Sequence, residues 1–155
     1  VNTYEEALKI VQSSKYPPNG VRGAGFGFAH DNYKNEGPLK YIDKANNNLI
    51  NIIQIETKEA LENVEKIAAI DGVDCLWVGH FDLTNFLGIP GQFSSDIYLK
   101  AINRVVAAAK LNKKSLGIMV NNRDELKMYS NIGFNMIAVG TEMSILSRSI
   151  SQILQ

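Results

Sequence analysis

The feature that most constrains the fold of this chain is a repeated alternation of short β-rich runs with longer segments whose apolar residues recur at helical spacing. The β-rich runs predict strands at 49–55, 73–78, 116–120 and 136–139. The segments that follow them predict helices at 58–70, 96–111, 123–132 and 143–154. Strands that alternate with helices pair in parallel, because each right-handed crossover returns the chain to the same end of the sheet.

The region before these units predicts two further helices. Thr3 and Glu6 have the spacing of a capping box, so a helix begins here. It ends before the two prolines that follow Tyr16, because proline lacks a backbone donor. A second helix is predicted at 39–47.

Two glycine-rich stretches predict loops. Residues 22–28 carry alternating glycines without the spacing of a nucleotide-binding loop, and we expect a loop with a short strand. Residues 79–93 hold three glycines and a proline and predict one long loop.

The alternation leaves two architectures open. Four βα units equal half of an eight-stranded (β/α)8 barrel, whose usual length is about 250 residues. An open four-stranded α/β sheet is the alternative. At 155 residues the chain is long enough for a real core, and we expect 1–155 to be a single domain. Because it starts with Val1 and enters a helix at once, we expect it to be the tail of a longer polypeptide.

Composition excludes several classes of function. With 16 basic and 16 acidic residues, a broad surface for nucleic acid or an anionic membrane is not expected. The single cysteine, Cys75, cannot form an internal disulfide and favours a reducing compartment, the cytoplasm. No apolar run approaches the ~20 residues of a membrane span.

Two carboxylates stand just past predicted neighbouring strands. Glu56 lies in Gln54-Ile55-Glu56-Thr57, and Asp82 lies in Gly79-His80-Phe81-Asp82-Leu83-Thr84. Parallel β/α folds keep their chemistry at this end of the strands. Two converging carboxylates suit a hard divalent cation such as Mg²⁺ or Mn²⁺.

Five short motifs stand in order along the chain: Tyr16-Pro17-Pro18-x-Gly20-x-Arg22-Gly23-x-Gly25, Gln54-Ile55-Glu56-Thr57, Gly79-x-x-Asp82-Leu83, Gly117-Ile118 and Ala138-Val139-Gly140. With them the chain resembles the HpcH/HpaI family of metal-dependent class II pyruvate aldolases. The resemblance implies a partial (β/α)8 TIM barrel, approximately the second half, with strands five to eight and their helices. The arginine and the histidine base of the family belong to the earlier half, and neither has a matching position here.

The resemblance also implies roles for individual residues. Glu56 and Asp82 look like the metal ligands, with Mg²⁺ or Mn²⁺ as the expected ion and Co²⁺ or Zn²⁺ as alternatives. Gln54 looks like the catalytic polar residue that orients a metal-bound water or the substrate. Backbone amides near Phe81 and Asp82 would bind the carboxylate of pyruvate. His80 replaces the common proline of the family.

The activity implied is that of a carbon–carbon lyase. It would cleave a small-molecule 4-hydroxy-2-oxo acid to pyruvate and an aldehyde through a metal-stabilised enolate, as a cytoplasmic homo-oligomer. Two other functions stay open: a non-catalytic half-barrel or assembly subunit, and a citramalyl- or malyl-thioester lyase of the same barrel type.

Three residues near these motifs have structural interpretations. Cys75 is expected to be an inert core thiol. Trp77 is expected to pack between the sheet and the helices. His80 is expected to be a loop or hydrogen-bonding residue, although it stands beside the proposed metal.

Overall fold

The computed structural model describes residues 1–34 and 36–154. The helices of this part are α1 (Tyr4–Ser14), α2 (Pro38–Asn48), α3 (Lys58–Glu62), α4 (Val64–Ala68), α5 (His80–Phe86), α6 (Asp96–Leu111), α7 (Arg123–Ile132) and α8 (Glu142–Ile153), with a 3-10 helix η1 (Ala29–Asp31). Its strands are β1 (Ile52–Ile55), β2 (Cys75–Val78), β3 (Ser115–Val120) and β4 (Met136–Val139).

The four strands form one parallel sheet in the order β1-β2-β3-β4. In the register of the sheet, Gln54 lies beside Trp77, and Trp77 lies beside Gly117. Because all strands run the same way, the segments that follow β1 and β2 meet at one edge of the sheet. The predicted α/β class, with strands in parallel, is confirmed.

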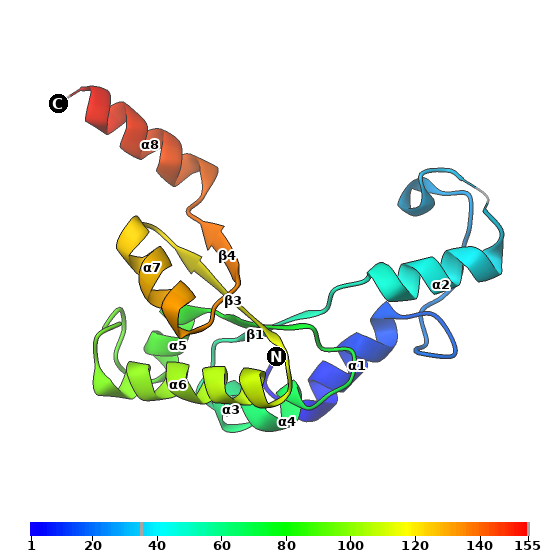
Figure 1. Cartoon of the computed structure of the whole chain (residues 1–155), viewed down its shortest axis with the longest axis horizontal. Helices are drawn as coiled ribbons and strands as arrows, with labels where there is room; N and C mark the ends of the chain where they lie inside the picture. The colour runs from blue at the N-terminus through cyan, green and yellow to red at the C-terminus, as the bar shows by residue number, and fades with distance from the viewer. Residues whose placement is uncertain (35, 155) are drawn as a thin grey trace.

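The two faces of the sheet are covered differently. Ile53, Ile55, Leu76 and Val78 are fully buried on one face, and Figure 1 shows α3, α4 and α6 together on one side of the sheet. On the opposite face Ile52 is 47% exposed and Gln54 is exposed as well. The apolar core therefore lies between the sheet and one layer of helices.

Helix α6 supplies much of that core. The Ser95 side chain caps its first turn by accepting from the Tyr98 amide at 3.3 Å. Its apolar residues recur every three or four positions, and Ile102, Val105 and Ala109 are buried. Burying a valine or isoleucine side chain contributes roughly 1.5–3 kcal/mol, so packing rather than propensity holds α6 in place.

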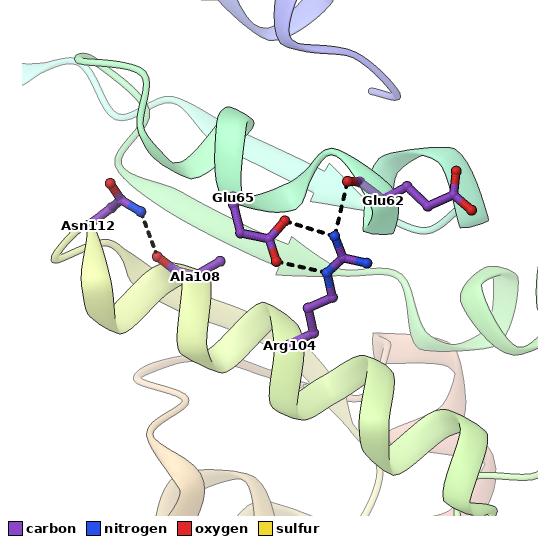
Figure 2. A network of polar contacts seen from close by, with 5 residues as sticks. All are labelled: Glu62, Glu65, Arg104, Ala108 and Asn112. Atoms are coloured by element: carbon purple, nitrogen blue, oxygen red, sulfur yellow. Dashed lines mark hydrogen bonds and ion pairs between the residues drawn. The ribbon is translucent and has the colours of Figure 1, made fainter.

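A polar network ties α6 to α3 and α4 (Figure 2). Arg104 of α6 donates to both carboxylate oxygens of Glu65, at 2.7 and 2.9 Å, and to the Glu62 carbonyl at 3.1 Å. A two-point guanidinium–carboxylate contact fixes orientation as well as distance. The network therefore sets how α6 lies against the helices that precede it.

The N-terminal segment is joined to the end of β1. The predicted capping box of α1 is present, with Thr3 and Glu6 bonding each other's backbone amides. Thr57, just after β1, donates its hydroxyl to the Asn2 side chain at 2.6 Å, and Asn63 donates to the Asn2 carbonyl at 3.1 Å. These contacts fasten the start of the chain beside the segment that holds Glu56.

The loop predicted for 79–93 is wrong in its first half, which forms α5. Leu83 is fully buried and anchors this short helix. The Thr84 hydroxyl donates to the Phe81 carbonyl at 2.8 Å and accepts from the Gly91 amide at 3.1 Å. These contacts with the following loop stabilise α5 despite the glycines around it.

Three smaller predictions are also wrong. The single helix expected at 58–70 is two helices that meet at Asn63. Trp77 shares the open face with Gln54, because neighbours in register point the same way, and so lies away from the helix layer. Residues 22–28, all of them described, form no strand.

Helix α8 projects from the sheet in Figure 1. None of its residues, all of which are described, is buried. Met143 is 72% exposed, Leu146 60% and Ile153 83%. No helix in the described part of the chain has the length and apolar character needed to cross a bilayer.

Candidate active site at the carboxyl ends of the strands

The side chains of Gln54, in β1, and Glu56, directly after β1, lie next to each other. Gln54 and Glu56 are two residues apart, so their side chains leave the strand on the same face. Gln54 Nε2 donates a hydrogen bond to Glu56 Oε2. Glu56 Oε1 accepts no hydrogen bond from the described residues, and the side chain is half-buried. Gln54 therefore holds Oε2 of Glu56 in place, and Oε1 can bind another group.

Gly79, at the end of β2, packs directly against this pair. Its amide donates to the Ile55 carbonyl at 3.1 Å. A Cβ at this position would lie 2.8 Å from Glu56 Cβ and 2.9 Å from Gln54 Nε2. The backbone φ of −82° is open to any residue. Glycine is therefore required here by close approach and not by backbone conformation.

Helix α5 starts immediately after Gly79 and carries Phe81 and Asp82 in its first turn. The first amides of any helix have no carbonyl partner within the helix. A carboxylate in the first turn is also favoured by the partial positive charge there. Both side chains are exposed, and Phe81 is 58% accessible.

A hollow of about 220 Å³ opens at this edge of the sheet. The residues that line it are Gln54, Trp77, Val78, Gly79, His80, Phe81, Asp82 and Met119. Three of the predicted site residues, Gln54, Phe81 and Asp82, therefore surround one space. Glu56 is not among the lining residues, and its contact with the site is the hydrogen bond from Gln54.

The donor set at this edge suits a hard divalent cation. Glu56 and Asp82 offer carboxylate oxygens and Gln54 offers an amide oxygen, which are the ligand types that Mg²⁺ and Mn²⁺ prefer. Among the described residues, no three His, Cys, Asp or Glu side chains gather where they could hold an ion. An ion bound here would complete its coordination with water and with a bound molecule.

His80 is buried between two hollows. It is 8% exposed, and its ring packs against Phe81 and Phe93 with centroids 4.6 and 5.2 Å away. Burial lowers the pKa of His80, and the nearby Glu125 carboxylate opposes that shift. His80 and Phe81 line the first hollow and also a second one of about 110 Å³, which reaches α7. The expected loop position is therefore wrong for His80, because it is an enclosed residue of α5.

The comparison with known proteins decides the family. Residues 1–149 match the family described as HpcH/HpaI aldolase/citrate lyase. The chain belongs to this family. The match covers nearly the whole sequence, so every strand and the residues at the strand ends fall within it.

Curated relatives of this HpcH/HpaI chain are longer than the chain itself. It is 33% identical over 149 residues to a 4-hydroxy-2-oxo-heptane-1,7-dioate aldolase from Shigella flexneri, covering 96% of this chain and 55% of the relative. It is 34% identical over 149 residues to a hydroxypyruvate/pyruvate aldolase from Delftia acidovorans, with the same two coverages. The chain thus spans about half the length of the curated relatives it matches.

A solved structure has the same fold. The HpcH/Hpal aldolase/citrate lyase family protein from Burkholderia cenocepacia J2315 superposes with a TM-score of 0.92 and 31% sequence identity. The superposition covers 100% of this chain and 61% of the other. The four-stranded sheet and its helices therefore follow a known HpcH/HpaI arrangement.

Glu125 of this HpcH/HpaI chain lines the second hollow, a position that was not predicted from the sequence. Its Oε2 accepts from the Asn121 amide at 2.8 Å and its Oε1 accepts from Asn122 Nδ2 at 2.9 Å. Asn122 in turn caps the Glu125 amide at 2.8 Å. An Asn-x-x-Glu pattern directly after a predicted strand is the signal that could have found it.

Cys75 behaves as the sequence predicts. The thiol is free and fully buried. Burial raises its pKa to about 11. A thiol held neutral in this way is a poor nucleophile and a poor metal ligand.

Proposed function

We propose that this chain is part of a divalent-metal-dependent aldolase that cleaves a 4-hydroxy-2-oxo acid to pyruvate and an aldehyde. The observation that carries the proposal is the hollow at the strand ends, where Gln54 and Asp82 face one space and Gln54 holds Glu56. Membership of the HpcH/HpaI family supports it. The names of the relatives from Shigella flexneri and Delftia acidovorans support the same class of reaction.

In this proposal Glu56 and Asp82 are the protein ligands of Mg²⁺ or Mn²⁺, with Co²⁺ or Zn²⁺ as alternatives. A bound divalent cation acts as a Lewis acid on a keto oxygen. Gln54 has two tasks: its Nε2 fixes the Glu56 carboxylate, and its amide orients the substrate or a water in the hollow. Gly79 leaves the space that the side chains of Gln54 and Glu56 occupy.

The first turn of α5 would bind the acid group of the substrate. The backbone amides of Phe81 and Asp82 lie in that turn, where N–H groups have no helical partner. Phe81 also lines the hollow and shields bound substrate from water. Cleavage breaks the bond between C3 and C4, the C4 hydroxyl loses its proton as the aldehyde leaves, and C3 gains a proton to become the methyl group of pyruvate.

We further propose that residues 1–155 are one unit, approximately the second half of a (β/α)8 barrel. Helices α3, α4 and α6 lie together on one side of the sheet in Figure 1, while the face that carries Gln54 has exposed side chains. In a closed barrel such a face becomes the filled interior. The lengths of the relatives support this proposal, because they leave room for further strands.

A second candidate function is assembly without catalysis, in a cytoplasmic homo-oligomer. The exposed apolar side chains of α8 favour association with another surface. Sedimentation of the complete polypeptide together with a Mn²⁺ titration separates the two candidates. An oligomer that binds no Mn²⁺ and releases no pyruvate supports assembly alone.

The experiment that tests catalysis measures two rates in the complete polypeptide: release of pyruvate from a 4-hydroxy-2-oxo acid, and exchange of the methyl protons of pyruvate with solvent. Both should require a divalent metal and stop on chelation. Glu56→Gln and Asp82→Asn should each lower both rates by about a hundredfold or more. Glu59→Gln, an exposed acid in the first turn of α3, is the matched control. Full activity in both Glu56→Gln and Asp82→Asn would contradict the proposal.

A further inference from the structure

Asn2 is held by hydrogen bonds at three of its groups. Its backbone amide donates to Glu6 Oε2 at 2.6 Å, and its backbone carbonyl accepts from Asn63 Nδ2 at 3.1 Å. Its side-chain Oδ1 accepts from the Thr57 hydroxyl at 2.6 Å. The backbone of Asn2 is therefore fixed both by the cap of α1 and by the residue at which α3 and α4 meet.

The Thr57 hydroxyl takes part in two hydrogen bonds. It accepts from the Ala60 amide at 3.0 Å, which caps α3, and it donates its one hydrogen to Asn2. Both Thr57 and Asn2 are half-buried, so water has limited access to this contact. Because Asn2 is 55 residues away in the sequence, the contact holds Thr57 in a place that its immediate neighbours do not set.

Glu56 lies between two residues that are anchored in this way. On one side the Ile55 carbonyl accepts from the Gly79 amide at 3.1 Å. On the other side stands Thr57, and Gln54 holds Oε2 of the Glu56 carboxylate itself. The peptide groups on both sides of Glu56 are thus fixed. A ligand held in this manner reaches an ion without rearrangement of the backbone, which favours binding.

We propose that Asn2 is a positioning residue of the metal site: acting through Thr57, it holds the backbone of Glu56 where the carboxylate can reach the ion. The inference rests on the proposed function, in which Glu56 is a metal ligand. Asn2 and Thr57 carry no charge, and neither lines the first hollow. Their effect on a bound cation is therefore one of geometry and not of direct attraction.

The test is the affinity of the complete polypeptide for Mn²⁺ without substrate, measured from the electron paramagnetic resonance of the free ion. Asn2→Ala removes the acceptor of the Thr57 hydroxyl. It should weaken Mn²⁺ binding by about three- to tenfold, less than the roughly 10–100-fold expected of a residue that bonds a ligand directly. Thr57→Ala removes the donor and should also weaken binding. Thr57→Ser keeps the hydroxyl and should retain the wild-type affinity.

Thr3→Ala is the matched control, because Thr3 is the neighbour of Asn2 and its hydroxyl caps α1 by accepting from the Glu6 amide at 3.2 Å. Loss of this cap should lower the thermal midpoint of the metal-free protein. The affinity for Mn²⁺ should stay unchanged, because Thr3 does not contact Thr57 through a hydrogen bond among those of the described residues. Equal losses of affinity in Thr3→Ala and Asn2→Ala would overturn the inference.

A double variant shows whether Asn2 acts through Glu56. In the Glu56→Gln background, Asn2→Ala should reduce the affinity for Mn²⁺ much less than in the wild type, because the carboxylate that Asn2 positions is gone. The same loss in both backgrounds would overturn the inference.

Failure of the proposed function has a different signature. If Glu56→Gln alone keeps the full affinity for Mn²⁺, the metal site is refuted and the inference with it. If Glu56→Gln weakens binding while Asn2→Ala does not, only the positioning role of Asn2 is refuted.

Discussion

Gly79 has no room for a side chain. Its neighbours across the edge of the sheet are Glu56 and Gln54, within 2.9 Å of where a Cβ would stand. A methyl group here must displace the very side chains proposed to bind the metal and the substrate. Small displacements of catalytic groups have large effects on rate, even where the fold survives.

Gly79→Ala should therefore lower the rate of pyruvate proton exchange in the complete polypeptide by about tenfold or more. Its thermal midpoint should fall only slightly, because the backbone conformation at 79 suits alanine. Gly23→Ala is the matched control, since no atom lies within 4 Å of the added Cβ. Equal rates in the two variants would show that the Gln54–Glu56 pair tolerates displacement.

Tyr98 and Tyr129 form a buried, hydrogen-bonded pair that stabilises the fold. The hydroxyl groups of Tyr98 and Tyr129 lie 2.7 Å apart, and the two side chains are 0% and 4% exposed. Burial raises the pKa of both phenols, so they stay neutral and hydrogen-bonded to each other. Each hydroxyl is therefore the hydrogen-bond partner of the other, which would otherwise be buried without one.

Tyr98→Phe and Tyr129→Phe should each destabilise the fold by about 1–2 kcal/mol, because each leaves one buried hydroxyl unpaired. The double variant should lose less than the sum, with a coupling energy of about 1 kcal/mol. Urea denaturation of the four proteins measures the cycle. Strictly additive losses would mean that the two hydroxyls do not depend on each other.

At the scale of elements, Arg104 joins α6 to the α3–α4 segment (Figure 2). The hydrogen bonds from Arg104 lower the pKa of Glu65, and the same contact raises the pKa of Arg104. Both side chains are partly exposed, at 42% and 49%, so solvent screens the pair. We therefore assign it about 0.5–1 kcal/mol of stability.

Because the pKa of Glu65 is lower in the folded state, this stability is present above the usual value of 4.5 and is lost as the pH falls through the folded value. Arg104→Met should thus lower the thermal midpoint at pH 7 by roughly 1–4 °C. The difference from wild type should shrink as the pH falls below 4.5. Lys100→Met is the control without an ion pair among the described residues. A difference that persists unchanged in acid would contradict an ionic contribution.

Elements with local signals at both ends could be predicted from the sequence. Helix α7 has the predicted bounds, since Asn122 caps its start and Gly133 adopts the left-handed conformation at its end, with φ of 117°. Helix α5 could not be predicted, because the burial of Leu83 and the contact of Thr84 with the following loop stabilise it against its glycines. The break at Asn63 likewise involves Asn2, 61 residues away.

At the scale of the whole molecule, the first hollow could be predicted and the second could not. Parallel strands bring Gln54 and Asp82 to one edge whatever the details of the loops, and both line one space. The second hollow depends on how α7 lies against α5 and the Phe93 loop. That packing results from buried contacts such as Tyr98 with Tyr129, which no spacing in the sequence reveals.

A Mn²⁺ titration of the complete polypeptide, monitored by water-proton relaxation, tests most directly whether Glu56 and Asp82 hold one metal ion. We expect one Mn²⁺ site per chain, weakened by about 10–100-fold or more in Glu56→Gln and in Asp82→Asn and unchanged in Glu59→Gln. A site that keeps its full affinity in both carboxylate variants would contradict the claim that Glu56 and Asp82 hold one metal ion.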